Sequence, residues 1–211
     1  MEKYELYKDI AQRTNGDIYI GVVGPVRTGK STFIKRFMDV MVIPNIKDEN
    51  QRIRLIDELP QSAAGKTIMT TQPRFIPNEA ATLDIGQDCT VRVRLADCGG
   101  CMVEGAMGHT ENNVPRMIRT PWFDYDIPFE EAAEIGTNKI ITEHSTIGIL
   151  ITTDGSITDI DRSAYIQAEG RVIAELKAAG RPFVVLVNST SPAAAPATEL
   201  AKDIAEKYKC V

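Results

Sequence analysis

The segment with the clearest chemical potential reads GPVRTGKST and runs from Gly24 to Thr32. It satisfies the pattern GxxxxGK[ST] at every fixed position, between an apolar run at 18–24 and an amphipathic run at 31–43. Glycines let the backbone curl so that successive N–H groups point at phosphate oxygens, and the start of a helix adds the positive end of its dipole. Lys30 is expected to reach the β- and γ-phosphates, and Ser31 to ligate Mg²⁺. The predicted phosphate-binding residues are Gly24, Pro25, Val26, Arg27, Thr28, Gly29, Lys30, Ser31 and Thr32.

A second motif, DxxG, occupies Asp97 to Gly100 at the end of the strand-like run VRVRLAD. An aspartate at a strand end can hold Mg²⁺ through water, and the backbone N–H of the glycine can sense the γ-phosphate. We therefore predict that Asp97 is a metal-associated catalytic residue and that Gly100 contacts the nucleotide. This interpretation makes Cys98 a filler residue of the motif.

Between the two motifs lies GKTIMTTQP, residues 65–73. Switch loops of P-loop GTPases carry a threonine that closes onto Mg²⁺ and the γ-phosphate. Thr70 and Thr71 both fall in the right interval, and the sequence does not choose between them. The alternative is that this segment is a solvated polar turn.

The nucleotide base is addressed by a different stretch, VNSTS at 187–191. GTPases of this architecture read guanine with [NT]KxD, whose aspartate accepts from guanine N1 and N2. Asn188 is retained, but Ser189 replaces the lysine and Ser191 replaces the aspartate. A buried donor without a partner costs about 1–3 kcal/mol, so ATP is favoured over GTP. Cys101 stands where small GTPases place a water-orienting glutamine, which predicts slow hydrolysis.

The cysteines allow one alternative use. Cys98 and Cys101 form a CxxC, but zinc needs two further ligands, and the only histidines are His109 and His144. Free, reduced cysteines of a cytosolic protein explain the four cysteines better. The net charge of −5 argues against broad affinity for nucleic acid or anionic membranes. No apolar run reaches the roughly 18 residues of a membrane span.

Apolar runs alternate with helical patterns along the chain. Strands are expected at 18–24, 90–100 (near a sheet edge), 146–155 and 181–190, and helices at 31–43, 129–144, 163–180 and 197–208. This alternation predicts an α/β domain with a mostly parallel sheet flanked by helices. Residues 47–78 and 101–128 do not fit the rhythm and are interpreted as long functional or mobile loops. The second contains Trp122, Phe123 and Tyr125, which either anchor the loop on its own core or form a contact surface.

The domain boundaries follow from the same pattern. Residues 1–16 are predicted to form a short amphipathic segment that stops near Asn15-Gly16. Residues 17–211 are predicted to form one P-loop domain. The chain ends after the last helix, where another strand of such a domain would be expected.

Four long runs make the chain resemble a known family, the stage IV sporulation protein A family of spore-forming bacteria. They are YKDIAQRTNGDIYIGVVGPVRTGKSTFIKRFM, DELPQSAAGKTIMTTQPRFIPN, PRMIRTPWFDYDIPFEEAAEIGT and EHSTIGILITTDGSITDI, and the resemblance covers essentially the whole chain. In the family pattern, the P-loop lysine falls on Lys30, the Mg²⁺-associated aspartate on Asp97 and the sensor threonines on Thr70 and Thr71.

The resemblance implies a P-loop fold related to translation-factor-like GTPases, but with ATPase activity. It implies that ATP hydrolysis drives assembly of a static homopolymer, the basement layer of the spore coat, on the forespore surface in the mother-cell cytoplasm. Further partners implied by the family are a small membrane-bound amphipathic peptide and other coat proteins, reached through a middle domain and a C-terminal region that this chain lacks.

Three functions remain open from the sequence. Lys30, Ser31, Thr70, Thr71 and Asp97 favour an Mg²⁺-dependent ATPase. Cys101 in place of glutamine favours a structural module that binds nucleotide with little turnover. A true GTPase is the third possibility.

Overall fold

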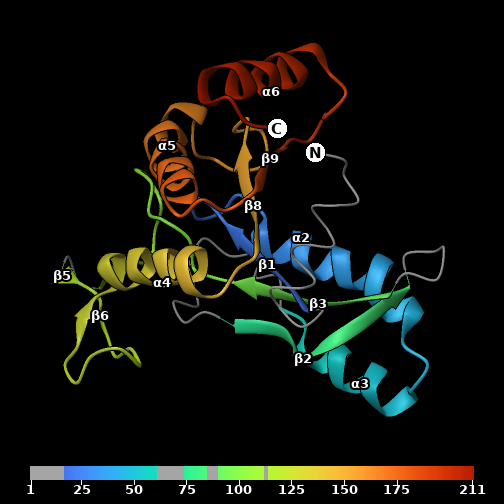
Figure 1. The fold of residues 1–211 in the computed structure, drawn as a ribbon. Helices are drawn as coiled ribbons and strands as arrows, with labels where there is room; N and C mark the ends of the chain where they lie inside the picture. The colour runs from blue at the N-terminus through green and yellow to red at the C-terminus, as the bar shows by residue number, and fades with distance from the viewer. Residues whose placement is uncertain (1–16, 61–73, 85–89, 112–113) are drawn as a thin grey trace.

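The computed structural model describes residues 17–60, 74–84, 90–111 and 114–211. The central sheet of this part of the chain has the order β2-β3-β1-β8-β9 (Figure 1). Its strands are β1 (Asp17–Val23), β2 (Arg74–Asp84), β3 (Thr90–Asp97), β8 (Ile147–Thr153) and β9 (Phe183–Asn188). β1, β3, β8 and β9 run parallel, and β2 pairs antiparallel with β3 at one edge. The prediction of a mostly parallel α/β sheet is confirmed.

The central strands read as continuous apolar runs because both faces of the sheet are covered. Val22 of β1 packs in one core cluster with Ile34 and Met38 of the following helical segment. Its neighbour Val23 packs in a second cluster, with Ile141 and Val172 from the other face. Successive residues of β1 thus point to opposite cores, and the strand is fixed in position from both sides.

One face of the sheet is covered by α2 (Lys30–Phe37) and α3 (Glu49–Glu58) (Figure 1). The prediction of a single helix over 31–43 is wrong for the second half of that range. The α-helix ends at Phe37 and continues as a π-turn (Met38–Val42) and a 3-10 turn (Ile43–Asn45). Pro44 has no N–H to donate, so regular helical hydrogen bonding cannot pass it.

The other face is covered by α4 (Phe129–Glu143) and α5 (Arg162–Ala178). Gly136 lies inside α4, and α5 is followed by a positive-φ glycine, Gly180. Beyond β9 lies α6 (Ala195–Tyr208), whose Tyr208 packs against the same cluster as α4 and α5. The helices at 129–144, 163–180 and 197–208 are therefore confirmed to within two residues at each end.

The two segments interpreted as long loops contain regular structure. Residues 47–78 include α3 and the start of β2. At the beginning of α3, the side chain of Asp48 accepts a hydrogen bond from the N–H of Gln51. Residues 101–128 form two short pairs, β4 (Thr110–Glu111) with β5 (Val114–Pro115) and β6 (Met117–Ile118) with β7 (Ile127–Pro128). These elements escape sequence reading because α3 exposes most of its side chains, β2 is interrupted by an irregular register, and the pairs are two residues long.

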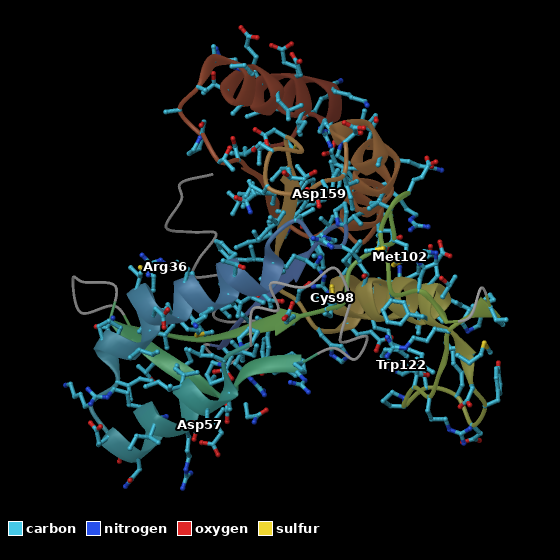
Figure 2. All side chains as sticks on the ribbon, turned by 180° about the vertical axis from the view of Figure 1, so that it is seen from behind. Arg36, Asp57, Cys98, Met102, Trp122 and Asp159 are labelled. Atoms are coloured by element: carbon cyan, nitrogen blue, oxygen red, sulfur yellow. The ribbon has the colours of Figure 1, made fainter. Side chains whose placement is uncertain are left out.

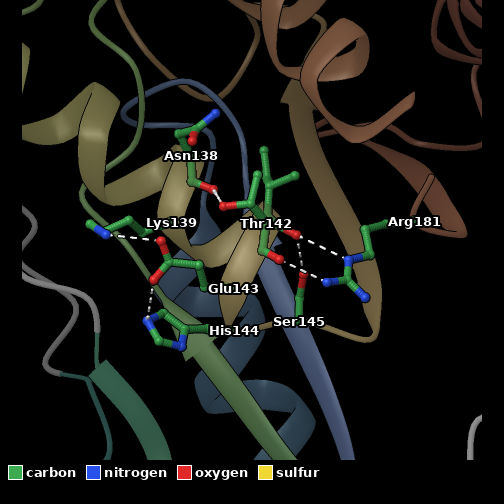
Figure 3. A network of polar contacts seen from close by, with 8 residues as sticks. Asn138, Lys139, Thr142, Glu143, His144, Ser145 and Arg181 are labelled. Carbon is green, nitrogen blue, oxygen red and sulfur yellow. Dashed lines mark hydrogen bonds and ion pairs between the residues drawn. The ribbon is translucent and has the colours of Figure 1, made fainter. Parts of the chain in front are cut away.

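The amino ends of the parallel strands are held by a polar network (Figure 3). Arg181, just before β9, donates from Nη2 to the carbonyl of Thr142 at 2.7 Å and from Nε to that of Ile141 at 3.3 Å. Lys139 pairs with Glu143 at 2.9 Å on the same helix. This network ties the end of α4 to the sheet, at the opposite end of the strands from the P-loop.

Residues after α6 return along the outer side of β9. The N–H of Val185 donates to the carbonyl of Val211 at 2.7 Å. The expectation of a further strand concerns residues beyond Val211 and stays a prediction, and the predicted segment 1–16 lies outside the described residues. In the described part of the chain, no helix has the length and apolarity needed to cross a membrane.

Candidate nucleotide-binding site

The loop between β1 and α2 has the curled backbone of a phosphate cradle. Gly24, Arg27 and Gly29 have φ of 133°, 61° and 93°, and the α-helix begins directly afterwards at Lys30. Thr28 is fully buried, and its hydroxyl donates to the carbonyl of Pro25 at 3.0 Å. These bends place the loop at the carboxyl end of β1 and against the N-terminus of α2, where anions are favoured.

Lys30 faces the inside of this loop. Its side chain is 5% exposed, and Nζ donates to the carbonyl of Pro25 at 2.5 Å. Burial lowers the pKa of Lys30, while the nearby Cys98 and Asp97 act in the opposite direction. A phosphate group beside Nζ would favour the charged form further, because an opposite charge stabilises the ammonium. The position fits the predicted role of Lys30.

Ser31 and Asp97 come together from α2 and the end of β3. Ser31 Oγ donates to Asp97 Oδ2 at 3.1 Å. Asp97 Oδ1 is buried and has no hydrogen-bond partner in the described part of the chain. Burial raises the pKa of Asp97, and Lys30 and the hydrogen bond from Ser31 act against that rise. A hydroxyl and a carboxylate with an unused buried oxygen are the donor types that Mg²⁺ prefers, so these residues fit the metal.

Gly100 brings the DxxG segment onto the P-loop. Its φ is 84°, and a Cβ at this position would overlap Lys30 Nζ and the carbonyl of Gly24. The next residue is bonded to the loop by its backbone: the N–H of Val26 donates to the carbonyl of Cys101 at 2.8 Å, and the N–H of Cys101 donates to the carbonyl of Gly24 at 3.3 Å. The two motifs predicted from the sequence therefore meet, and only glycine fits at the contact.

The side chains of the CxxC are packed inside the protein. Cys98, labelled near the centre of Figure 2, belongs to the core cluster under α4 and α5, and its Sγ is 3.6 Å from the carbonyl of Val22. Burial raises the pKa of the Cys98 thiol to about 11 and also raises the pKa of Cys101. Among the described residues, no group of three or more His, Cys, Asp or Glu side chains is placed to hold a metal ion. Both thiols are neutral at physiological pH and contribute by packing.

The loop predicted to face the base follows β9 and lies beside the loop after β8. Asn188 Nδ2 donates to the carbonyl of Thr28 at 3.0 Å, which ties β9 to the P-loop. Thr190 N–H donates to Ser156 Oγ, and that hydroxyl donates to Asp154 Oδ1 at 2.6 Å. Slight burial acts to raise the pKa of Asp154, but hydrogen bonds from Ser156 and Ser189 outweigh it and the pKa is lowered. A carboxylate thus lies beside the loop predicted to lack one.

The predicted site residues separate into two groups. The P-loop residues, Asp97, Gly100 and Asn188 lie together, whereas Thr32 is exposed on the first turn of α2. Thr70 and Thr71 lie outside the described residues. The sequence analysis did not place the carboxylate of Asp154 beside this loop. The only signal was its position directly after a buried strand, which is where ligands bind in parallel sheets.

A phosphate cradle between strand and helix, an oxygen pair suited to Mg²⁺ and a mostly parallel sheet define a P-loop nucleotide-binding domain. Comparison with protein families agrees. Residues 1–211 match the family model described as stage IV sporulation protein A, ATPase domain, and the chain belongs to that family. The resemblance inferred from the four sequence runs is confirmed.

Curated relatives support the same assignment. The chain is 59% identical over 208 residues to stage IV sporulation protein A of Bacillus subtilis and 56% identical to that of Bacillus anthracis. It is 52% identical over 204 residues to that of Clostridioides difficile. These alignments cover 97–99% of this chain but 42% of each relative, so the chain spans less than half of their length.

Among solved structures, the chain is similar to a dimerisation-deficient variant of Toc33 from Arabidopsis thaliana. The two share 12% identity with a TM-score of 0.36, over 97% of this chain and 89% of the other. The family assignment rests on the sequence comparisons alone.

Proposed function

We propose that this domain binds ATP with Mg²⁺ and hydrolyses it slowly. The observation that carries the proposal is the meeting of Lys30, the Ser31–Asp97 pair and Gly100 at one end of the sheet. These groups come from two motifs about 70 residues apart in the sequence. A glycine-rich turn that matched the motif by chance would not explain why the two motifs meet.

The reaction is the attack of a water oxygen on the γ-phosphorus of ATP. The bond from that phosphorus to the β–γ bridging oxygen breaks, and ADP, inorganic phosphate and one proton are released. In this proposal Lys30 and the loop N–H groups bind the phosphates, and the N–H of Gly100 senses the γ-phosphate. Ser31 and Asp97 would hold Mg²⁺, which when bound supplies positive charge to the phosphate oxygens. Thr70 or Thr71 is proposed to complete this site.

A second candidate is a nucleotide-binding assembly module with little turnover. It is favoured by Cys101, whose side chain is buried and whose thiol has a raised pKa. A neutral, packed thiol neither orients water nor accepts a proton from it, so turnover depends on some other group.

A third candidate is a GTPase, and Asp154 is the observation in its favour. Its carboxylate lies beside Ser189 and Thr190, although Ser156 already occupies one of its oxygens. We favour ATP because Ser191, at the position of the guanine-reading aspartate, offers only a short neutral hydroxyl.

For the whole protein, we propose that turnover in the P-loop domain (residues 17–211) drives self-assembly of a homopolymer, the basement layer of the spore coat. The proposed location is the mother-cell cytoplasm at the forespore surface. The proposed partners are further copies of the protein, a small membrane-bound amphipathic peptide and other coat proteins, with no nucleic acid. The support is the family membership and the ATPase description of the matched domain.

The test is phosphate release from ATP by this chain and by its Lys30→Ala variant. Release by the unmodified chain that disappears in the variant supports the ATPase. ATP binding that depends on Lys30 without measurable release would instead support the assembly module. Release that is unchanged in Lys30→Ala would show that the P-loop is not the reaction site.

A further inference from the structure

Arg27 has an unusual backbone for its side chain. Its φ is 61°, and among the described residues Lys209, at the end of α6, is the only other non-glycine residue with positive φ. Side chains are disfavoured in this region, and glycine adopts it without strain. At the apex of a phosphate-binding loop, glycine would therefore be the relaxed choice, and an arginine held there points to a use for its side chain.

The strain is maintained by bonds on both sides of Arg27. On one side, the N–H of Val26 donates to the carbonyl of Cys101, and the Pro25 carbonyl accepts from Lys30. On the other, the Thr28 carbonyl accepts from Asn188 Nδ2 at 3.0 Å. Three elements, the DxxG segment, α2 and β9, thus fix the backbone around Arg27. The guanidinium is therefore attached to a backbone that is hydrogen-bonded on both sides.

The charge of Arg27 is uncommitted. The side chain is partly exposed, while its neighbours Val26 and Thr28 are buried. In the part of the chain that the structure describes, Arg27 forms no ion pair or hydrogen bond. The arginines of α5 behave differently: Arg162 pairs with Glu169 at 2.7 Å, and Arg171 pairs with Glu134 at 2.6 Å. A free cation on a phosphate-binding loop is available for the nucleotide.

Besides Lys30 and the Mg²⁺ that Ser31 and Asp97 would hold, hydrolysis is accelerated by a further positive group beside the γ-phosphate. Negative charge spreads over the γ-phosphate oxygens as the bond to the bridging oxygen breaks, and Lys30 supplies one cation. Cys101 is neutral and packed away, so it contributes none. The rival is Arg74, which lies opposite Asp97 across β2 and β3 and acts to lower the pKa of that carboxyl. Arg74 is exposed on the edge strand, and it already lies opposite the carboxylate of Asp97.

We propose that Arg27 is a catalytic residue, an arginine supplied by the P-loop itself. Its planar fork donates to the γ-phosphate oxygens and neutralises the charge that grows on them during hydrolysis. This inference rests on the proposed ATPase function. It places a cation for the γ-phosphate at the loop apex, and it predicts that hydrolysis needs no arginine from another protein.

The experiment compares Arg27→Gly and Arg27→Lys with the unmodified chain. Glycine suits the positive φ, so the first variant keeps the loop fold while it removes the charge. Two quantities are measured: the affinity for ADP alone, and the affinity for ADP with aluminium fluoride, a planar mimic of the transferred phosphoryl group. Phosphate release from ATP is followed in parallel. Arg36→Ala, exposed farther along α2 (Figure 2), is the matched control, and Arg74→Ala tests the rival.

In Arg27→Gly, ADP affinity should change by less than about threefold, whereas the aluminium fluoride complex should weaken by about 100-fold. Phosphate release should fall by a similar factor, with Arg27→Lys between the two, because lysine keeps the charge without the fork. Equal losses for both ligands, no loss, or the selective loss in Arg74→Ala instead would overturn the assignment. An unmodified chain that releases no phosphate would refute the ATPase proposal, and Arg27 would then be judged on the aluminium fluoride complex alone.

Discussion

The phosphate side of the site is buried and bonded together, whereas the base side is an open loop. Thr28 is fully buried and Lys30 is 5% exposed, and both are held by the Pro25 carbonyl. On the base side, Ser189 is partly exposed, and Thr190 and Ser191 are exposed. All nucleoside triphosphates carry the same phosphates, so a loop can bind them through the shape and N–H groups of its backbone. The base is read by side chains, which can be exchanged without disturbing the fold.

The largest effect should come from reversing the charge at the centre of the phosphate side. Lys30→Glu replaces a cation that faces the phosphates with an anion, so nucleotide binding should be abolished. Lys35→Glu, exposed on the same helix, makes the same charge change away from the loop and should bind ATP as the unmodified chain does. Calorimetric titration with ATP measures both. Near-normal ATP affinity in Lys30→Glu would remove the P-loop assignment.

The next effect separates binding from chemistry. Asp97→Asn keeps the shape of the side chain, which contacts Ser31, but it removes the charge that is proposed to anchor the metal. ATP binding should persist, because the loop backbone still holds the phosphates, while phosphate release should fall by about 10- to 100-fold. Asp57→Asn on the exposed face of α3 is the control. An unchanged rate in Asp97→Asn would contradict the interpretation of the DxxG motif.

Gly100→Ala tests the contact between the two motifs. The added methyl group would overlap Lys30 Nζ and the Gly24 carbonyl, so the segment must move away from the loop. We expect phosphate release to fall by about tenfold. Gly180→Ala has a similar backbone strain, with φ of 63°, but nothing lies within 4 Å of its Cβ, so it should leave the rate unchanged. Equal rates in the two variants would show that the contact is unimportant for turnover.

The smallest effect is expected at the base. Ser189→Lys together with Ser191→Asp should shift the preference toward GTP by about 1–3 kcal/mol, because a carboxylate can then accept from guanine N1 and N2. Asp154→Asn is the matched variant on the facing loop, and it should leave the ratio of ATP to GTP affinity unchanged. If Asp154→Asn alone weakens GTP binding selectively, Asp154 is the guanine reader and the base pocket lies nearer β8.

The elements around the phosphates could be predicted because each has a local signal. The buried strand before Gly24, the helix that starts at Lys30 and the strand that ends at Asp97 all show in hydrophobic periodicity. Their meeting follows from the parallel sheet, since the carboxyl ends of parallel strands lie along one edge.

Other parts depend on contacts distant in sequence. Asp154 reaches Ser189 only because β8 and β9 are neighbours in the sheet. The hydrogen bond that the N–H of Val26 donates to the carbonyl of Cys101 involves no side chain, so no residue type in the sequence indicates it. The positive φ of Arg27 is likewise imposed by its surroundings, against the preference of the residue.

The most direct test of the central claim is calorimetric titration of the unmodified chain with ATP and with GTP, each in the presence of Mg²⁺. In this account the phosphate cradle is buried, the base loop is open, and Ser191 stands where GTPases have the guanine-reading aspartate. ATP should therefore bind at least as tightly as GTP. Clearly tighter binding of GTP would contradict it, and would mean that another carboxylate, such as that of Asp154, reads the guanine.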